Sequence, residues 1–359
     1  MALTMEDLLK AMVERRASDL HIIAGLPPFL RVDQKLVPLV DRPLAPSETR
    51  SLIYSVLTDN QKKRLETELE LDFAISIEGV SRFRANAYWQ KGTLAAAIRR
   101  IPIRIPTPEK LGLPPVVSGL AQKSQGLVLV TGPTGSGKTT TLASLINKIN
   151  NERSVHIITI EDPIEYVFVP KLAIISQREV EQDTQSFARA LKFALRQDPD
   201  VIMVGEMRDV ETIAAALTAA ETGHLVLATL HTYSAIESIN RIIDVFPAHQ
   251  QAQIRTQLAQ VVEAVIAQRL LPRASGKGLA LAVEVMIATP AIRTLIRESR
   301  IHEIYGVIQT SQRYGMRTMN MSLIELYRKG EISWQTALLA SPNPEELKRM
   351  GREAGVVVA

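Results

Sequence analysis

The sequence predicts an α/β protein in which a smaller α+β domain precedes a parallel-sheet domain, and three observations support this prediction. Residues 71–101 contain three short segments with the apolar–polar alternation of strands that bury one face. Five prolines are concentrated in residues 101–115, which favours an extended linker over a helix or a central strand. From residue 118 to 270, short apolar strands alternate with helical segments, the order typical of a parallel sheet covered by helices.

These patterns divide the chain into four predicted regions. The N-terminal domain spans 1–100, the proline-rich linker 101–117, the parallel-sheet core 118–270 and a helical C-terminal region 271–359. The strand of the first domain that follows Ser81 places Arg82 and Arg84 on its polar face, and Arg99 lies on the next strand. The first domain is therefore expected to carry a basic sheet face, either as a solvated surface or as a source of functional arginines.

Composition excludes several classes of protein. The 359 residues include 42 Lys and Arg against 38 Asp and Glu, and a net charge of +4 is too small to favour nucleic-acid binding. The chain has no cysteine, which excludes disulfides and thiolate zinc sites, and its six histidines form no ligand-spaced pair on a helix, so no zinc is expected. No apolar stretch is long enough to span a bilayer, and a soluble intracellular protein is expected.

The segment 132–140, GPTGSGKTT, matches the phosphate-binding loop pattern G-x-x-x-x-G-K-[ST] and stands between a predicted strand and a predicted helix. Glycines in such a loop let backbone N–H groups surround phosphate, and the helix N-terminus adds partial positive charge. Lys138 is expected to reach the β- and γ-phosphates of ATP, and the Thr139 hydroxyl to bind Mg²⁺. The predicted nucleotide-binding residues are Gly132, Pro133, Thr134, Gly135, Ser136, Gly137, Lys138, Thr139 and Thr140.

Two acidic segments are expected at the same sheet edge, because ligands bind beyond the carboxyl ends of parallel strands. Glu206 follows the apolar strand 201–204, and Glu161, Asp162 and Glu165 follow the strand 156–160. One carboxylate can hold the magnesium shell while another orients the attacking water. We expect Glu206 on the metal side and Glu165 on the water, although the sequence leaves this division open.

Two histidines flank the predicted strand 225–230. His231 follows the strand and is expected at the phosphate edge, where it could hydrogen-bond the γ-phosphate. His224 precedes the strand, and a structural or allosteric role at the opposite end is expected for it.

Together these segments resemble the secretion ATPase superfamily of hexameric motors. Its four characteristic segments correspond here to the Walker A loop 132–140, the acidic segment 161–166, a Walker B strand ending in Gly205-Glu206, and the histidine segment 223–232. The chain is most similar to the PilT-like branch, the retraction ATPases of type IV pili. Residues 290–298, PAIRTLIRE, resemble that branch's own motif, with Thr294 where asparagine is usual. The absence of a four-cysteine zinc module agrees with this branch.

The resemblance implies a PAS-like N-terminal domain and a RecA-like C-terminal ATPase domain assembled into a homohexameric ring. It implies that Arg84 and Arg99 act as arginine fingers, and that the inner-membrane platform protein and an assembly ATPase are candidate partners of a cytoplasmic, peripherally membrane-associated motor. It also implies that the motif near 290 serves retraction, so polar residues at Leu295 and Ile296 should stop retraction and spare nucleotide binding. The motif residues are Ala291, Ile292, Arg293, Leu295, Ile296, Arg297 and Glu298.

Three alternatives remain open from the sequence. An accessory pilus or type II secretion motor of the same superfamily would carry the same motifs. A nucleic-acid translocase is disfavoured by the small charge surplus, and DNA-stimulated, salt-sensitive activity would reverse that judgement. A scaffold that binds nucleotide without turnover is disfavoured by the presence of Lys138, Thr139 and Glu206.

Overall fold

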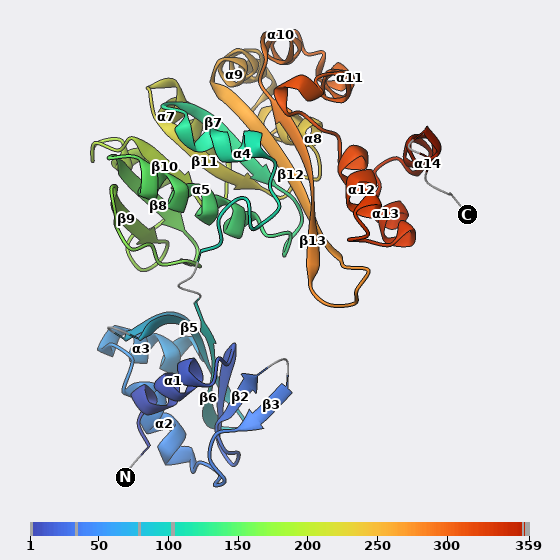
Figure 1. Ribbon diagram of the computed structural model, residues 1–359. Helices are drawn as coiled ribbons and strands as arrows, with labels where there is room; N and C mark the ends of the chain where they lie inside the picture. Colours follow the sequence, from blue (N-terminus) through green and yellow to red (C-terminus); the bar gives the residue numbers. More distant parts are fainter. Residues whose placement is uncertain (1–2, 33–34, 78–79, 102–104, 354, 356–359) are drawn as a thin grey trace. The chain divides into compact units, whose positions relative to one another are not determined.

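A computed structural model describes residues 3–32, 35–77, 80–101, 105–353 and 355 of the chain (Figure 1). The chain forms two compact units: Met1–Arg104 with Glu165–Val167, and Ile105–Ile164 with Phe168–Ala359. The predicted linker 101–117 includes residues 102–104, which lie outside the described residues. Each unit is described by itself.

The first unit is a six-stranded sheet with the strand order β3-β2-β1-β6-β5-β4 and antiparallel neighbours. Helix α1 begins after a capping box between Thr4 and Asp7, and its buried side chains join the apolar face of the sheet in one core. The elements are α1 (Met5–Glu14), β1 (Asp19–Ile23), β2 (Phe29–Val32), β3 (Lys35–Pro38), α2 (Pro46–Tyr54), α3 (Asp59–Glu68), β4 (Glu70–Ile77), β5 (Ser81–Gln90) and β6 (Thr93–Arg100).

The second unit contains a seven-stranded sheet with the order β13-β12-β7-β11-β10-β8-β9. All neighbouring strands are parallel except β12 and β13, which form an antiparallel pair. The strands are β7 (Gly126–Thr131), β8 (His156–Glu161), β9 (Ile174–Glu179), β10 (Val201–Val204), β11 (Leu225–Leu230), β12 (Val262–Pro272) and β13 (Leu279–Ile287). The predicted α/β fold class, with its parallel sheet, is confirmed.

Helices cover this sheet, and those from α6 to α11 share one large apolar cluster with the sheet face that carries Leu127 and Leu129. The helices are α4 (Pro115–Gly119), η1 (Leu120–Gln122), α5 (Lys138–Glu152), α6 (Phe187–Ala194), α7 (Val210–Glu221), α8 (Ala235–Asp244), α9 (Ala248–Val261), α10 (Pro290–Arg297), η2 (Ile301–Glu303), α11 (Ile304–Thr310), η3 (Gln312–Tyr314), α12 (Met319–Arg328), α13 (Trp334–Ala340) and α14 (Pro344–Glu353). Helices α12–α14 lie beside β13 and form a second cluster with Leu271, Ala280 and Ala282 (Figure 1).

The region from residue 271, predicted to be helical, contains a long strand, and that part of the prediction is wrong. β13 pairs with β12 along its whole length, from Leu279 opposite Pro272 to Ile287 opposite Ala264. The first four of its nine residues alternate leucine and alanine, from Leu279 to Ala282, and alanine is depleted in strands. Antiparallel pairing with β12 across the short connection 273–278 decides the conformation.

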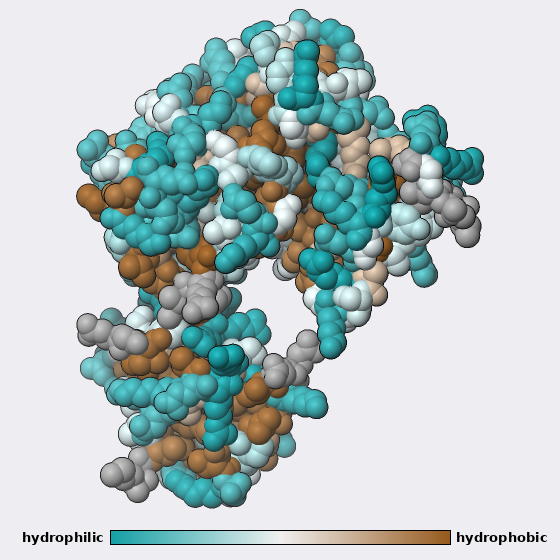
Figure 2. Space-filling model, viewed as in Figure 1, coloured by the Kyte–Doolittle hydropathy of each residue, from teal (hydrophilic) through white to brown (hydrophobic). Residues whose placement is uncertain are grey.

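Hydrophilic residues predominate on the face drawn in Figure 2, and hydrophobic ones occupy smaller areas. No helix in the described part of the chain combines the length and the apolar character needed to cross a bilayer.

Candidate active site

The phosphate loop joins β7 to α5, as the sequence predicts, and its shape requires glycine at two positions. Gly132 has φ 145°, and a Cβ there would lie 2.4 Å from the carbonyl oxygen of Gln268. Gly137 has φ 87° and forms the N-cap of α5. Lys138 begins α5 and turns back over the loop, where its Nζ donates to the carbonyl oxygens of Gly132 at 2.9 Å and Pro133 at 3.1 Å. The loop thus holds a buried ammonium group at the end of a helix, the arrangement that binds phosphate.

Gln268 fixes the loop from the neighbouring strand, and sequence reasoning did not identify it. The side chain is 1% exposed. Its Nε2 donates to the carbonyl oxygen of Ser136 at 2.7 Å, and its Oε1 accepts from the Thr141 hydroxyl at 3.0 Å. One amide group therefore holds both the loop and the first turn of α5 against β12.

Replacing Gln268 with alanine should leave the Ser136 carbonyl and the Thr141 hydroxyl without their buried partner. We expect the free energy of unfolding to fall by about 1–3 kcal/mol for the lost hydrogen bonds, and nucleotide affinity to fall with the order of the loop. Denaturant unfolding and calorimetric titration with ADP measure the two effects. Gln257→Ala, at a half-buried glutamine bonded to Glu221, is the control. Unchanged ADP affinity in Gln268→Ala would remove Gln268 from the site.

Glu206 lies just beyond β10 and is held by two basic side chains. Arg208 approaches both carboxylate oxygens, at 2.6 and 2.7 Å, and His231 Nε2 lies 3.1 Å from Oε1. Burial raises the pKa of Glu206, but the Arg208 hydrogen bond and the charges of His231 and Arg208 outweigh it and lower the pKa below its ordinary value. The ionised carboxylate therefore stabilises the fold above the usual carboxyl pKa, and this contribution is lost as pH falls through the lowered value.

The registers of the parallel strands bring the predicted segments to one sheet edge. Thr131, just before the phosphate loop, pairs with Leu230, just before His231. Val204, two residues before Glu206, pairs with both Ala228 and Ile160. The phosphate loop, Glu206, His231 and the acidic segment consequently leave neighbouring strands at the same level, beyond their carboxyl ends.

The three acids of the segment 161–165 occupy different environments. Glu161 is buried, and its Oε1 accepts from the Thr159 hydroxyl at 2.6 Å and from Gln177 Nε2 at 3.2 Å. Asp162 and Glu165 are exposed in the irregular segment that follows β8. Glu161 is thus fixed by neutral donors, whereas Asp162 and Glu165 are accessible to a ligand.

His224 lies at the other end of β11 from His231. Its Nδ1 lies 2.9 Å from the carbonyl oxygen of Ala219, in the last turn of α7, and 3.2 Å from the Thr222 hydroxyl. This contact ties His224 to the C-terminal end of α7, and the structural or allosteric role expected for His224 stays a prediction.

The two predicted arginine fingers lie side by side in the first unit, where Arg84 on β5 pairs in register with Arg99 on β6. Arg99 Nε donates to Asp19 Oδ1 at 2.8 Å, and Arg31 Nε lies 3.7 Å from Asp19 Oδ2. Arg84 is exposed and has no ion pair within the described residues. The basic face predicted from the sequence is present, and Asp19 neutralises part of it.

The motif near 290 forms helix α10, and its residues have two different environments. Ile292, Leu295 and Ile296 are at most 8% exposed and belong to the main core. Arg293 donates to the carbonyl oxygens of Ala259 and Gln260 at the end of α9, at 2.9 and 2.7 Å. The remaining motif residues, Ala291, Arg297 and Glu298, are exposed.

A cavity of about 400 Å³ adjoins the phosphate loop. It is lined by Pro133–Ser136 of the loop, by Tyr233 and Arg269, and by Leu339 of α13, which is 81% exposed. The Arg269 guanidinium lies 5.7 Å from the centre of the Tyr233 ring and donates to the carbonyl oxygen of Ala340. An apolar and aromatic cavity beside a phosphate loop suits a nucleotide base and sugar.

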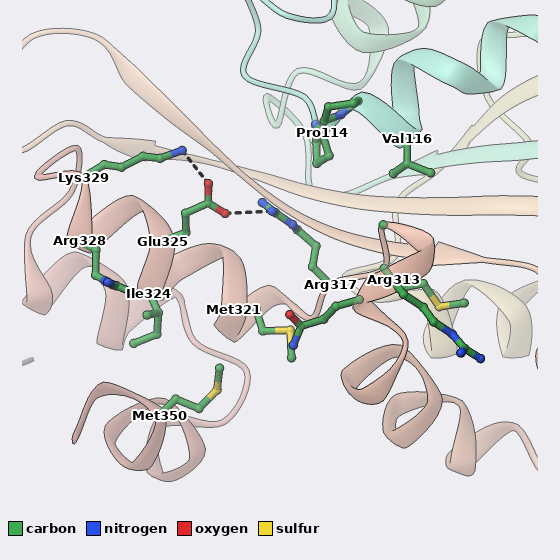
Figure 3. A pocket seen from close by; sticks show the side chains of 14 residues that line it. Pro114, Val116, Arg313, Arg317, Met321, Ile324, Glu325, Arg328, Lys329 and Met350 are labelled. Atoms are coloured by element: carbon green, nitrogen blue, oxygen red, sulfur yellow. Dashed lines mark hydrogen bonds and ion pairs between the residues drawn. The ribbon is translucent and has the colours of Figure 1, made fainter. Parts of the chain in front are cut away.

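A larger cavity of about 940 Å³ lies elsewhere, between residues 114–116, 312–317 and helix α12 (Figure 3). Glu325 projects into it and is held by Arg317 at 2.9 Å and Lys329 at 2.6 Å (Figure 3). The described lining of this larger cavity includes no glycine-rich loop at a helix N-terminus. Its size alone therefore does not make this cavity the nucleotide site.

The donor set at the phosphate loop fits magnesium, which keeps most of its waters and binds through few protein groups together with substrate phosphates. The Thr139 hydroxyl and the ionised carboxylate of Glu206 are such groups. Ser136 Oγ, which is buried without a hydrogen-bond partner in the described part of the chain, is a further oxygen of the same loop. Within the same described residues, no cluster of three or more His, Asp or Glu could hold a metal ion alone.

The chain resembles known proteins along most of its length. The family model described as type II/IV secretion system protein matches residues 2–336. The chain belongs to this family. Within it, the chain is 48% identical over 339 residues to the type IV pilus retraction ATPase PilT of Pseudomonas aeruginosa, covering 94% of this chain and 98% of PilT. It is 42% identical to the type IV pilus ATPase PilU of the same organism, covering 96% and 90%.

Solved structures agree with these family relationships. A crystal structure of the pilus retraction motor PilT with bound ADP superposes with a TM-score of 0.90 at 51% identity, covering 97% of this chain and all of that one. The ATPase DotB of Legionella pneumophila superposes with a TM-score of 0.83 at 29% identity, covering 94% and 96%. The similarity to pilus retraction ATPases that the motifs indicated is confirmed.

Proposed function

We propose that this chain is a Mg²⁺-dependent ATPase that powers retraction of type IV pili. The observation that carries the proposal is the shared sheet edge, where the buried Lys138 and the ionised Glu206 both lie beyond carboxyl strand ends. The relatives PilT and PilU are named as type IV pilus ATPases, and the PilT structure contains bound ADP. The 400 Å³ cavity beside the loop would take the nucleoside.

Each residue of the site would have its own role in the reaction. Lys138, now bonded to two loop carbonyls, would exchange these partners for the β- and γ-phosphates of ATP. Thr139 and Glu206 would hold Mg²⁺, which neutralises phosphate charge when bound. Glu165, exposed beyond β8, would orient the attacking water, and His231 would contact the γ-phosphate from its position beside Glu206.

Phosphate release by the purified chain, with ATP and Mg²⁺ and again with EDTA, tests the enzyme. A deletion strain tests the biological role, and the proposal expects cells that carry excess pili and do not twitch. Hydrolysis that persists at full rate in EDTA would contradict the magnesium site, and normal twitching in the deletion strain would contradict retraction.

The arginine fingers are proposed to act within a homohexamer, in which the first unit supplies charge to a γ-phosphate. Arginine fingers contribute about 10³–10⁵ to turnover. Arg84→Ala should lower kcat more than Arg99→Ala, because Asp19 already binds Arg99. Steady-state phosphate release measures this effect, with Arg15→Ala, at an exposed arginine beyond α1, as the control. Unchanged kcat in Arg84→Ala would exclude it as a finger.

Helix α10 is proposed as the element that transmits hydrolysis to retraction, through its exposed residues. Polar side chains at Leu295 or Ile296 would disrupt the core, since truncating a buried Leu or Ile costs about 2–5 kcal/mol of stability. Polar variants of Leu295 and Ile296 are therefore no longer expected to spare nucleotide binding. The role in retraction is assigned to the exposed residues of α10.

The variant Arg297→Ala/Glu298→Ala should keep its melting temperature and its ATP hydrolysis, because exposed substitutions usually change stability by less than about 0.5 kcal/mol. It should nevertheless lose twitching in cells. Glu345→Ala/Lys348→Ala, which removes an ion pair from the surface of α14, is the control. Normal twitching in the double variant would exclude this surface as a retraction element.

The partners follow from the same proposal: other copies of this chain, the inner-membrane pilus platform protein and an assembly ATPase, at the cytoplasmic face of the inner membrane. The second candidate function is that of an accessory pilus motor, because the chain is also 42% identical to PilU, a type IV pilus ATPase whose name does not specify retraction. Twitching that fails only under load in the deletion strain would support the accessory role.

A further inference from the structure

Glu284 is a buried carboxyl group that the reaction above does not use. It lies near the middle of β13 and is 4% exposed. In register it pairs with Ala267, which pairs with Thr131, which pairs with Leu230. Glu284 therefore stands at the same level of the sheet as the residues that lead into the phosphate loop and into His231.

The carboxyl group of Glu284 faces the first N–H groups of two helices. The Ala235 N–H, at the start of α8, donates to Oε1 at 2.8 Å, and the backbone of Met319, at the start of α12, lowers the pKa of the same carboxyl group. Helix N-termini leave such groups unsatisfied and carry partial positive charge, so a carboxylate there is a strong acceptor. Burial raises the pKa of Glu284 despite these two donors and the charge of Arg269.

The two helices belong to different parts of the second unit. α8 follows the turn that begins with His231, and its Ser238 hydroxyl reaches the Thr131 hydroxyl at 3.4 Å on the same sheet face. α12 opens the C-terminal cluster of α12–α14, which packs apart from the main core. The other bonds at the start of α8, from the N–H groups of Tyr233 and Glu237, end within that segment itself.

We propose that Glu284 is a positioning residue that ties the histidine turn of the nucleotide site to the C-terminal helices. A change at His231 on nucleotide binding would move the start of α8, and Glu284 would pass this movement to the start of α12. By reciprocity, the position of α12 would influence the turnover of bound ATP. This inference rests on the proposed ATPase function.

The test compares Glu284→Met, which removes the acceptors at similar volume, with Glu284→Gln, which keeps an acceptor oxygen. We expect Glu284→Met to lower kcat at least tenfold and to leave KM for ATP within threefold, because Gln268 holds the phosphate loop independently. Glu284→Gln should recover most of the lost turnover. Ser322→Ala is the control: it removes the bond from the Val283 N–H to the Ser322 hydroxyl, between β13 and α12, and does not touch α8.

Hydrogen exchange on the wild-type chain provides a second measurement that depends on no variant. A non-hydrolysable ATP analogue should slow exchange of the amides at 235–238 and also at 319–323. Protection confined to the first segment would overturn the inference, as would equal kcat in Glu284→Met and wild type, or an equal loss in Ser322→Ala. A wild-type chain that releases no phosphate would instead overturn the proposed function.

Discussion

Replacing Glu206 with glutamine is expected to lower turnover by about 10²–10⁴, the usual contribution of a group that activates water or handles its proton. Glutamine keeps the size of the side chain and loses the charge, which the contacts with Arg208 and His231 and the lowered pKa of Glu206 favour. The phosphate loop does not depend on this charge, so ATP binding should persist. Single-turnover phosphate release and ATP titration separate the two effects.

Glu211→Gln is the matched control, since Glu211 is an exposed glutamate in the first turn of α7, five residues further along the chain. It should hydrolyse ATP at the wild-type rate. Wild-type turnover in Glu206→Gln would mean that this carboxylate neither binds the metal nor affects the water.

Replacing Lys138 with alanine is expected to abolish nucleotide binding at micromolar concentrations. Truncating one partner of a buried, hydrogen-bonded charge pair costs about 2–5 kcal/mol, and 1.4 kcal/mol is about a tenfold change in affinity. The buried ammonium group here has two loop carbonyls as partners and a helix N-terminus around it. Fluorescence titration with a labelled ADP measures the loss.

Lys148→Ala, at the other end of the same helix and paired with Glu152 at 2.6 Å, controls for a general effect on α5. A melting temperature close to that of wild type is required before the loss of binding in Lys138→Ala is assigned to the phosphates. Retained ADP affinity in a folded Lys138→Ala protein would contradict the site.

The local parts of the site could be predicted from the sequence. The phosphate loop occupies nine consecutive residues that link a strand to a helix, and Glu206 lies two residues after a strand of four buried residues. In both cases neighbouring residues determine the geometry. The parallel order of the strands then places Glu206 and His231 at one edge without any knowledge of side-chain contacts.

The residues that the sequence did not reveal act over long separations. Gln268 reaches Ser136 across 132 positions and Thr141 across 127, and no spacing rule connects them. Arg208 lies beside Glu206 in the sequence, but only the fold shows that it turns back to bind both carboxylate oxygens. For helix α10, the apolar stripe was visible, and only the core shows that Leu295 and Ile296 are structural.

The identity of the nucleotide bound after incubation with Mg²⁺ and ATP tests most directly whether Lys138 and Glu206 act on one triphosphate. The nucleotide would be extracted from the washed protein and separated by chromatography. The account predicts ADP from the wild-type chain, intact ATP from Glu206→Gln and none from Lys138→Ala. ADP recovered from Glu206→Gln in the wild-type amount and time would contradict it.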